Sequence, residues 1–191
     1  MNIVKDCKVE DLFSLKDKVV LVVGAGGLGE YIGRGMAQNG AKIVFTNTSI
    51  GKAEKVQAEM AKDGLACDIY QLDVTNDEQV TEVVAKIAEK YGRIDVLVNV
   101  AGIVLANTLD TITEADIDKT IAINVKAPMF ATQVAARQMK KQGRGSIIVI
   151  ASTAGLMGVA NRMAYSTSKG ALVIMCNSIA AELAGTNVRI N

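Results

Sequence analysis

Short β-prone runs alternate with helical stretches along almost the whole chain, and this alternation limits the fold more than any other feature of the sequence. Strands are predicted at residues 18–23, 42–47, 68–73, 96–99, 147–151 and 188–191, and helices up to 39 and at 52–63, 80–91, 121–141 and 165–183. Because strands joined through helices run in the same direction, the pattern predicts an α/β fold with a doubly wound parallel sheet and right-handed crossovers.

The composition is typical of one globular domain and argues against nucleic acid and membranes as partners. Half of the 191 residues are hydrophobic, and we expect residues 18–191 to form one domain behind an N-terminal arm of residues 1–17. Lys and Arg total 21 against 20 Asp and Glu, so the charge favours neither nucleic acid nor an anionic membrane as a partner. Without an apolar signal segment or a run of membrane-spanning length, the chain is expected to be cytoplasmic.

Histidine is absent from the sequence. Its absence excludes Ser-His-Asp hydrolysis, Cys-His proteolysis and the catalytic zinc sites that use histidine. The cysteines, Cys7, Cys67 and Cys176, lack the spacing of metal ligands, and we expect inert thiols and no metal. Proton transfer would therefore depend on Tyr, Lys, Asp, Glu or Cys.

A glycine-rich segment follows the first predicted strand and opens the first predicted helix. Its sequence is Gly24-Ala25-Gly26-Gly27-Leu28-Gly29, which has the Gly-x-Gly-x-x-Gly spacing of dinucleotide-binding turns. Glycines allow the backbone to approach a pyrophosphate, and the helix N-terminus offers free amides. We therefore predict cofactor contacts from Gly24, Gly26, Gly27, Leu28 and Gly29. The alternative is a tight turn that binds no ligand.

The end of the second predicted strand carries no carboxylate to bind a ribose 2′-hydroxyl. Thr46-Asn47-Thr48-Ser49 stands there instead, and its hydroxyls and amide, with Lys52, could accept a 2′-phosphate. Asn47, Thr48 and Ser49 are thus predicted to contact the cofactor, which favours NADP while leaving NAD possible. The alternative is that these polar residues only cap the next helix.

Tyr165, Lys169 and Ser152 are the candidate catalytic residues. Tyr165 and Lys169 are four positions apart, so on a helix they share one face. A positive charge beside a phenol favours its ionised form and makes it suitable for acid/base chemistry. Ser152 ends an apolar run thirteen positions before Tyr165 and could hold a substrate oxygen. Together they predict redox chemistry on an alcohol or carbonyl.

With these motifs in place, the chain resembles the short-chain dehydrogenase/reductase family from Lys18 onward. Leu72-Asp73-Val74 resembles the family's adenine-contacting segment, and Asn99-Val100-Ala101-Gly102 resembles its Asn-Asn-Ala-Gly element. Asn124 resembles its helix asparagine, and Val188-Arg189-Ile190-Asn191 the start of its sixth strand. The resemblance implies a Rossmann-like fold.

The resemblance also implies roles for residues of this sequence. Tyr165 would exchange a proton with the oxygen of an alcohol or ketone while hydride passes to or from a nicotinamide, and Ser152 would orient that substrate. Lys169 would assist Tyr165 and bind the nicotinamide ribose, and Asn124 would hold a water beside it. The implied cofactor contacts are Asp73, Val74, Asn99, Ala101, Gly102, Tyr165 and Lys169. The helices near 121–141 and 165–183 would pair in a homo-oligomer.

Two of these residues have alternative interpretations. Asp73 could accept a hydrogen bond from the adenine amine or could simply be a solvated loop carboxylate. In a regular helix the Asn124 carbonyl would accept from residue 128, but Pro128 has no N–H. Pro128 therefore predicts either a kink with a free carbonyl at Asn124 or the first turn of a helix that starts after Asn124.

The sequence departs from the family pattern in two places. The family's Thr-Gly-x-x-x-Gly-x-Gly loop is one residue longer, and Val23 replaces its threonine. Family members also continue through a Pro-Gly loop, substrate-covering helices and a last strand, which this sequence lacks. We therefore expect an exposed sheet edge and little substrate recognition. A nucleotide-binding module with weak or no activity, or a structural subunit, is the alternative to an active oxidoreductase.

Overall fold

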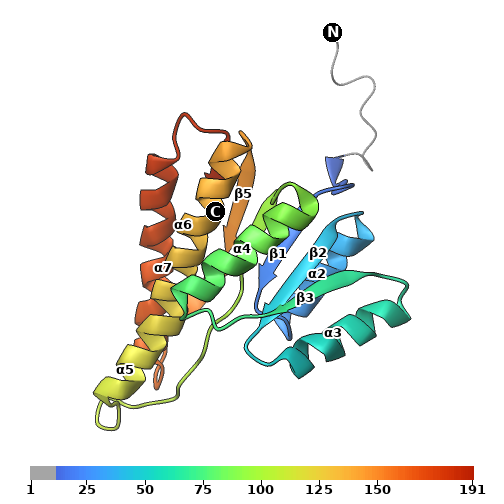
Figure 1. Ribbon diagram of the computed structural model, residues 1–191. Helices are drawn as coiled ribbons and strands as arrows, with labels where there is room; N and C mark the ends of the chain where they lie inside the picture. The colour runs from blue at the N-terminus through green and yellow to red at the C-terminus, as the bar shows by residue number, and fades with distance from the viewer. Residues whose placement is uncertain (1–11) are drawn as a thin grey trace.

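The computed structural model describes residues 12–191, and its centre is a six-stranded sheet between two layers of helices (Figure 1). All five pairs of neighbouring strands are parallel, and their order is β3-β2-β1-β4-β5-β6. The strands are β1 (Val19–Val23), β2 (Lys42–Asn47), β3 (Cys67–Gln71), β4 (Val96–Asn99), β5 (Gly145–Val149) and β6 (Val188–Ile190). This is the doubly wound Rossmann-like order, so the predicted fold is confirmed.

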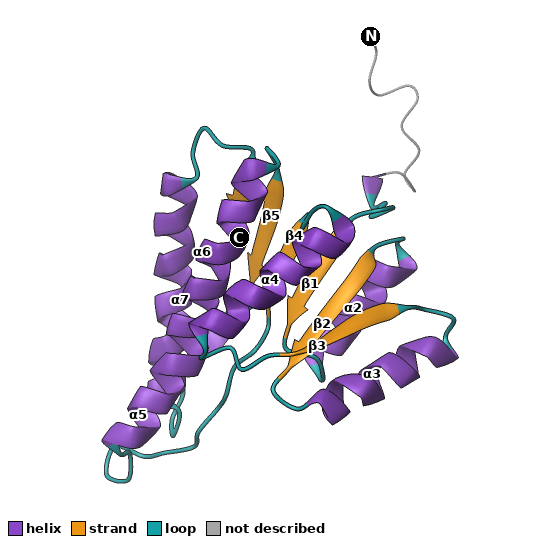
Figure 2. Cartoon of the chain, viewed as in Figure 1, coloured by secondary structure: helices purple, strands orange, loops and turns teal. Residues whose placement is uncertain are grey.

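The helices divide between the two faces of the sheet (Figure 2). One face is covered by α2 (Leu28–Gln38) and α3 (Ile50–Lys62), and the other by α4 (Asp77–Tyr91), α6 (Ala127–Lys141) and α7 (Met163–Glu182). Each face has its own apolar cluster, so the central strand β1 is buried along its whole length. This explains why β1 is a continuous run of Val and Leu instead of alternating with polar residues.

The predicted helix at 121–141 is part of a longer helical segment. Helix α5 (Glu114–Ile121) leads directly into a π-helical turn, Ala122–Lys126, and then into α6. The Ala127 N–H donates to the carbonyl of Ala122, five residues earlier, and Pro128 lies in the first turn of α6. The wider turn accommodates the missing N–H of Pro128. Pro128 is therefore in the first turn of α6, which begins after Asn124 as one of the two interpretations expected, although the helical segment continues before it without a break.

Other boundaries differ by a few residues from the predicted ones. Strand β5 begins and ends two residues before the predicted strand, because Gly145 already pairs with Val188. Part of the predicted arm also contacts the domain: the Leu15 N–H donates to the Asn39 carbonyl, and the Asp17 N–H donates to Gly40. In the described part of the chain, no helix combines the length and apolar character needed to span a membrane.

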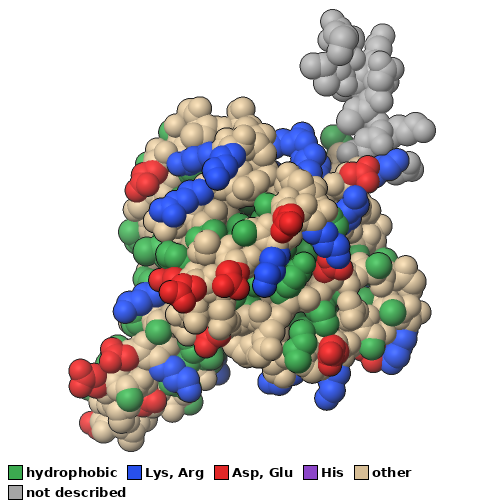
Figure 3. Space-filling view, in the orientation of Figure 1, with side chains coloured by type: hydrophobic (Ala, Val, Ile, Leu, Met, Phe, Trp, Pro, Cys, Tyr) green, Lys and Arg blue, Asp and Glu red, His purple; other side chains and the backbone are tan. Residues whose placement is uncertain are grey.

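The charges on the face shown in Figure 3 are mixed, with acidic and basic side chains interspersed. This matches the near balance of 21 basic and 20 acidic residues. The loops that follow β1, β2, β3 and β4 meet at the carboxyl edge of the sheet, where the strand order reverses between β1 and β4. In doubly wound sheets, ligands bind in the crevice at this edge.

Candidate functional site

A cavity of about 350 Å³ opens at the carboxyl edge of the sheet. It collects residues from four successive strand ends, which is the position expected for a nucleotide. Eight of the predicted cofactor residues line it: Gly24, Gly26, Asn47, Thr48, Asp73, Val74, Ala101 and Gly102. Its other lining residues, Ala25, Thr46, Leu72, Val100, Ile103 and Ile123, were not predicted as contacts.

The glycine loop is shaped by close backbone contacts. Gly24, Gly26 and Gly27 have φ angles of 111°, 115° and 51°, a region that side-chain-bearing residues rarely adopt. A Cβ at Gly29 would lie 2.0 Å from the Gly24 carbonyl oxygen, so the first turn of α2 packs directly against the loop. A Cβ added at Gly26 or Gly27 would meet no atom within 4 Å, which leaves open space beside the backbone there.

Gly27, Leu28 and Gly29 do not line the cavity. Gly27 is the N-cap of α2 and Leu28 its first residue, with 53 % of the Leu28 surface exposed. Gly29 is buried beneath the loop. Ser49 is also outside the lining; it occupies the N-cap position of α3, but its side chain makes no capping hydrogen bond.

Asp73 is an exposed residue just beyond β3. Its Oδ1 accepts hydrogen bonds from the Thr75 backbone N–H at 2.9 Å and from the Thr75 hydroxyl at 2.7 Å. These bonds hold the pKa of the Asp73 carboxyl below its usual value. Asp73 is therefore an oriented, ionised acceptor at the rim of the cavity, next to the buried Val74.

Asn99 is the last residue of β4 and does not line the cavity. Its side chain is buried, and Nδ2 donates to the Thr132 hydroxyl of α6 at 3.1 Å. Ala101 and Gly102 follow it to the cavity, with the Ala101 N–H donating to the Val23 carbonyl at 2.8 Å. The Asn99 side chain therefore connects β4 to α6.

Lys169 is buried on the inner face of α7, with 5 % of its surface exposed. Its Nζ donates to the Ile150 carbonyl at 2.7 Å and lies 5.9 Å from the centre of the Tyr165 ring. Burial lowers the pKa of the Lys169 ammonium below its ordinary value. The predicted pairing of Tyr165 and Lys169 on one helix face is present, and the ammonium is held by the end of β5.

Gly102 connects Lys169 to the cavity. A Cβ added at Gly102 would lie 3.2 Å from Asn124 Oδ1 and 3.7 Å from Lys169 Nζ. Because Gly102 also lines the cavity, Lys169 and Asn124 lie next to it. A side chain at position 102 would separate the two regions.

Asn124 lies in the π-helical turn and is 1 % exposed. Its Oδ1 accepts from the Ile103 N–H at 2.8 Å, and its Nδ2 donates to the Ile103 carbonyl at 2.9 Å and to the Ser168 hydroxyl at 3.0 Å. The side chain therefore fixes the loop after β4 against α7. Its predicted role in holding a water stays a prediction.

Ser168 was missed by the sequence analysis. It is completely buried, and its hydroxyl accepts from Asn124 and donates to the Tyr165 carbonyl at 2.7 Å. Its position three residues after Tyr165, on the same helix face, was the available signal.

Ser152 follows the end of β5 and is half-buried. Its Oγ accepts from the Ala154 N–H at 3.2 Å. This contact uses the hydroxyl as an acceptor, so its hydrogen is available for donation to another oxygen.

The cysteine thiols lie apart from this site. Burial raises the pKa of the Cys67 thiol to about 11, and it also raises that of Cys176. Both remain protonated and weakly nucleophilic near neutral pH. Cys7 lies outside the described residues. Within residues 12–191, no group of three or more Cys, Asp or Glu side chains could hold a metal ion.

Comparison with known proteins gives matches along most of the chain. The family model for short chain dehydrogenases matches residues 18–191. An oxidoreductase of Thermotoga maritima described as uncharacterized is 39% identical over 180 residues, which cover 93% of this chain and 70% of the relative.

Two solved structures are also similar. A metagenomic short-chain oxidoreductase in complex with NADP has a TM-score of 0.86 and 34% identity, covering 93% of this chain and 81% of its own. An NAD⁺-bound xylitol dehydrogenase has a TM-score of 0.88 and 33% identity, and the match covers 92% of this chain and 68% of the dehydrogenase.

Proposed function

Because the chain belongs to the short-chain dehydrogenase family, we propose that it interconverts a secondary alcohol and a ketone, with Tyr165 as the general acid and base. The family membership makes it an NAD(P)-dependent oxidoreductase. The observation that carries the finer proposal is the position of Lys169: its ammonium is 5.9 Å from the Tyr165 ring and adjoins the cavity through Gly102.

The cavity suits a nicotinamide dinucleotide. The backbone of Gly24 and Gly26 borders it without side chains, and the open space beside Gly26 gives room for a pyrophosphate. Asp73 provides an ionised acceptor for an adenine amine, and no carboxylate follows β2 to repel a 2′-phosphate. We infer NADP as the preferred cofactor, with NAD possible. The similar structures in complex with NADP and NAD⁺ support both.

In the proposed reaction the cofactor supplies or accepts the hydride. Tyr165 gives its hydroxyl proton to the ketone oxygen during reduction and takes it back during oxidation. Ser152 donates its free hydroxyl hydrogen to the same oxygen and orients the substrate. The Lys169 ammonium, held by the Ile150 carbonyl, stabilises the tyrosinate left after proton transfer.

The test of this proposal has two steps. The first is a titration of the purified chain with NADPH and NADH, followed by nicotinamide fluorescence. The second is a screen of ketones and alcohols for a change in NADPH absorbance. We expect saturable binding with a preference for NADPH and turnover of at least one carbonyl class. Saturable cofactor binding without turnover of any ketone or alcohol in the screen would instead support the alternative, a nucleotide-binding module without activity.

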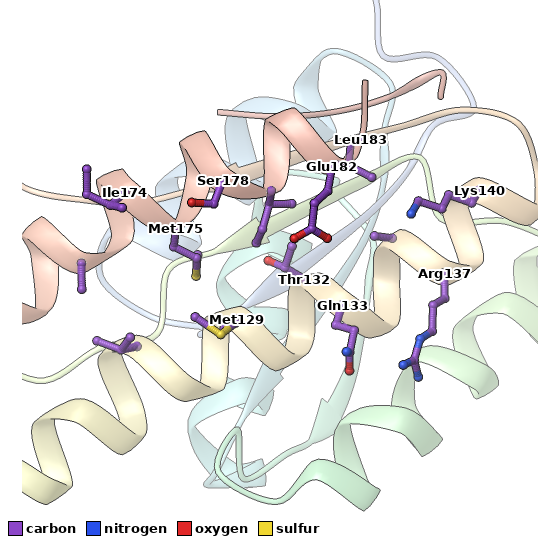
Figure 4. A pocket seen from close by; sticks show the side chains of 14 residues that line it. Met129, Thr132, Gln133, Arg137, Lys140, Ile174, Met175, Ser178, Glu182 and Leu183 are labelled. Carbon is purple, nitrogen blue, oxygen red and sulfur yellow. The ribbon is translucent and has the colours of Figure 1, made fainter. Parts of the chain in front are cut away.

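We also propose that a second copy of the chain covers the outer groove between α6 and α7. The groove has a volume of about 700 Å³, and its lining residues come from both helices (Figure 4). Met129 and Ile174 are 46 % and 65 % exposed there, while Arg137, Lys140 and Glu182 supply charge at one end. A self-complementary, two-fold contact would bury these side chains.

Analytical ultracentrifugation tests this pairing. We expect a dimer or larger oligomer for the unchanged chain and a shift toward monomer for Ile174→Glu. Leu109→Glu is the matched control, because Leu109 is 79 % exposed on a loop outside the groove. A monomeric unchanged chain, or an unchanged assembly for Ile174→Glu, would contradict the proposal.

A further inference from the structure

Asn47, the last residue of β2, uses its carboxamide to join two loops. Nδ2 donates to the Ala25 carbonyl of the glycine loop at 2.5 Å, and Oδ1 accepts from the Ser49 N–H at 3.0 Å. A carbonyl only accepts and a backbone N–H only donates, so these partners determine the orientation of the amide. Both polar ends of Asn47 are therefore engaged within the protein, although the residue lines the cavity.

The same strand end holds the glycine loop at two further points. The Thr46 carbonyl accepts from the Gly24 N–H at 3.1 Å and from the Ala25 N–H at 2.7 Å. With the bond from Asn47, both the N–H and the carbonyl of Ala25 are held by β2. Glycines at 24, 26 and 27 leave the loop little conformational preference of its own, so contacts from outside must fix its shape.

We propose that Asn47 is a positioning residue that sets the shape of the glycine loop, and that it leaves recognition of the ribose end to Thr48 and Ser49. The inference rests on the cofactor site proposed above and assigns a different task to one of its residues. Thr48 lines the cavity and is exposed, and the exposed Ser49 side chain is free of a capping bond.

The geometry also explains why an acidic residue is unsuitable at this position. An aspartate at 47 would place a carboxylate oxygen against the Ala25 carbonyl oxygen, where the amide now donates at 2.5 Å. Two acceptors in contact repel each other, and the Ala25 carbonyl would lose its partner. The carboxylate used to bind the ribose of NAD would therefore disturb the loop that holds the pyrophosphate.

The experiment compares dissociation constants for NADPH and NADH in the unchanged chain, Asn47→Asp and Asn47→Ala. In Asn47→Ala, loss of the hydrogen bond to the glycine loop is expected to weaken binding of both cofactors roughly tenfold and by the same factor. Asn47→Asp should weaken NADPH binding further, because its carboxylate also repels the 2′-phosphate, and should not tighten NADH binding. Hydrogen exchange of the peptide covering residues 24–29 should become faster in both variants, while the thermal midpoint stays within a few degrees. If Asn47→Asp fails to fold, Asn47→Ala carries the same test.

Gln71→Ala is the matched control. Gln71 Nε2 donates to the Thr48 carbonyl at 3.0 Å, so it contacts the same turn without touching the glycine loop. Binding of both cofactors to this variant should stay within twofold of the unchanged chain.

Three results would overturn the inference. Tighter NADH binding by Asn47→Asp, or a tenfold change in the ratio of the NADH and NADPH dissociation constants for Asn47→Ala, would show that Asn47 faces the ribose. Unchanged affinity in both variants would show that its bond does not position the loop. If the unchanged chain bound neither cofactor, the proposed site itself would fail, and that failure is visible before any variant is made.

Discussion

Asn124 and Ser168 are joined by a buried hydrogen bond of 3.0 Å that connects the π-helical turn to α7. The same serine hydroxyl donates to the Tyr165 carbonyl at 2.7 Å. One side chain thus fixes the backbone of the proposed catalytic tyrosine relative to the loop that follows β4. The amide of Asn124 completes the connection through its two bonds to Ile103.

Ser168→Ala should lower the free energy of unfolding by about 1–3 kcal/mol, because one buried N–H of Asn124 would lose its acceptor. Urea unfolding measures the change. Ser166→Ala is the control: the Ser166 hydroxyl is buried without a partner, so its removal should cost little or stabilise the fold. Equal losses for the two serines would argue against a structural role for the Asn124 bond.

Gly29→Ala should destabilise the chain by about 3 kcal/mol and abolish cofactor binding, since its Cβ would lie 2.0 Å from the Gly24 carbonyl oxygen. Gly35→Ala is the comparison within the same helix. No atom lies within 4 Å of its added Cβ, and alanine favours a helix by about 0.5–1 kcal/mol over glycine. Thermal unfolding and NADPH titration should separate the two; cofactor binding by Gly29→Ala would contradict the packing described for the loop.

Lys169 should make stability depend on pH in the alkaline range. Burial lowers its folded-state pKa below the ordinary 10.5, so between these two values the unfolded chain binds more protons than the folded one. The Lys169 contribution to stability should therefore rise as the pH rises through that window. Denaturant unfolding of the unchanged chain and of Lys169→Met gives this contribution as a difference. A difference that falls with rising pH would contradict the burial of the ammonium.

Much of the fold was predictable because the apolar runs are strongly patterned. Strands β2 and β4 have the predicted bounds, and the helix predicted at 80–91 lies within α4, whose buried residues Val80, Val83, Val84 and Ile87 are spaced as one apolar face. The spacing of apolar residues could not reveal the π-helical turn before Pro128, because a π-helical turn only widens one turn within a continuous helical segment.

The candidate site was predictable where a motif depends on position along a strand. Gly24, Asp73 and Ala101 lie at the cavity because the strands that precede them end at one edge. Asn99 could not be placed in this way, since its side chain turns toward Thr132 on α6. The bond between Asn124 and Ser168 and the bond from Asn47 to Ala25 join residues distant in sequence, which no local pattern specifies.

The most direct test of the proposed function is a single-turnover transfer of deuterium from C4-deuterated NADPH to a ketone, in the unchanged chain and in Tyr165→Phe. We predict deuterated alcohol from the unchanged chain and a rate roughly 10³-fold lower for Tyr165→Phe, with NADPH affinity within twofold. Transfer by Tyr165→Phe at the unchanged rate would contradict the assignment of Tyr165 as the acid and base.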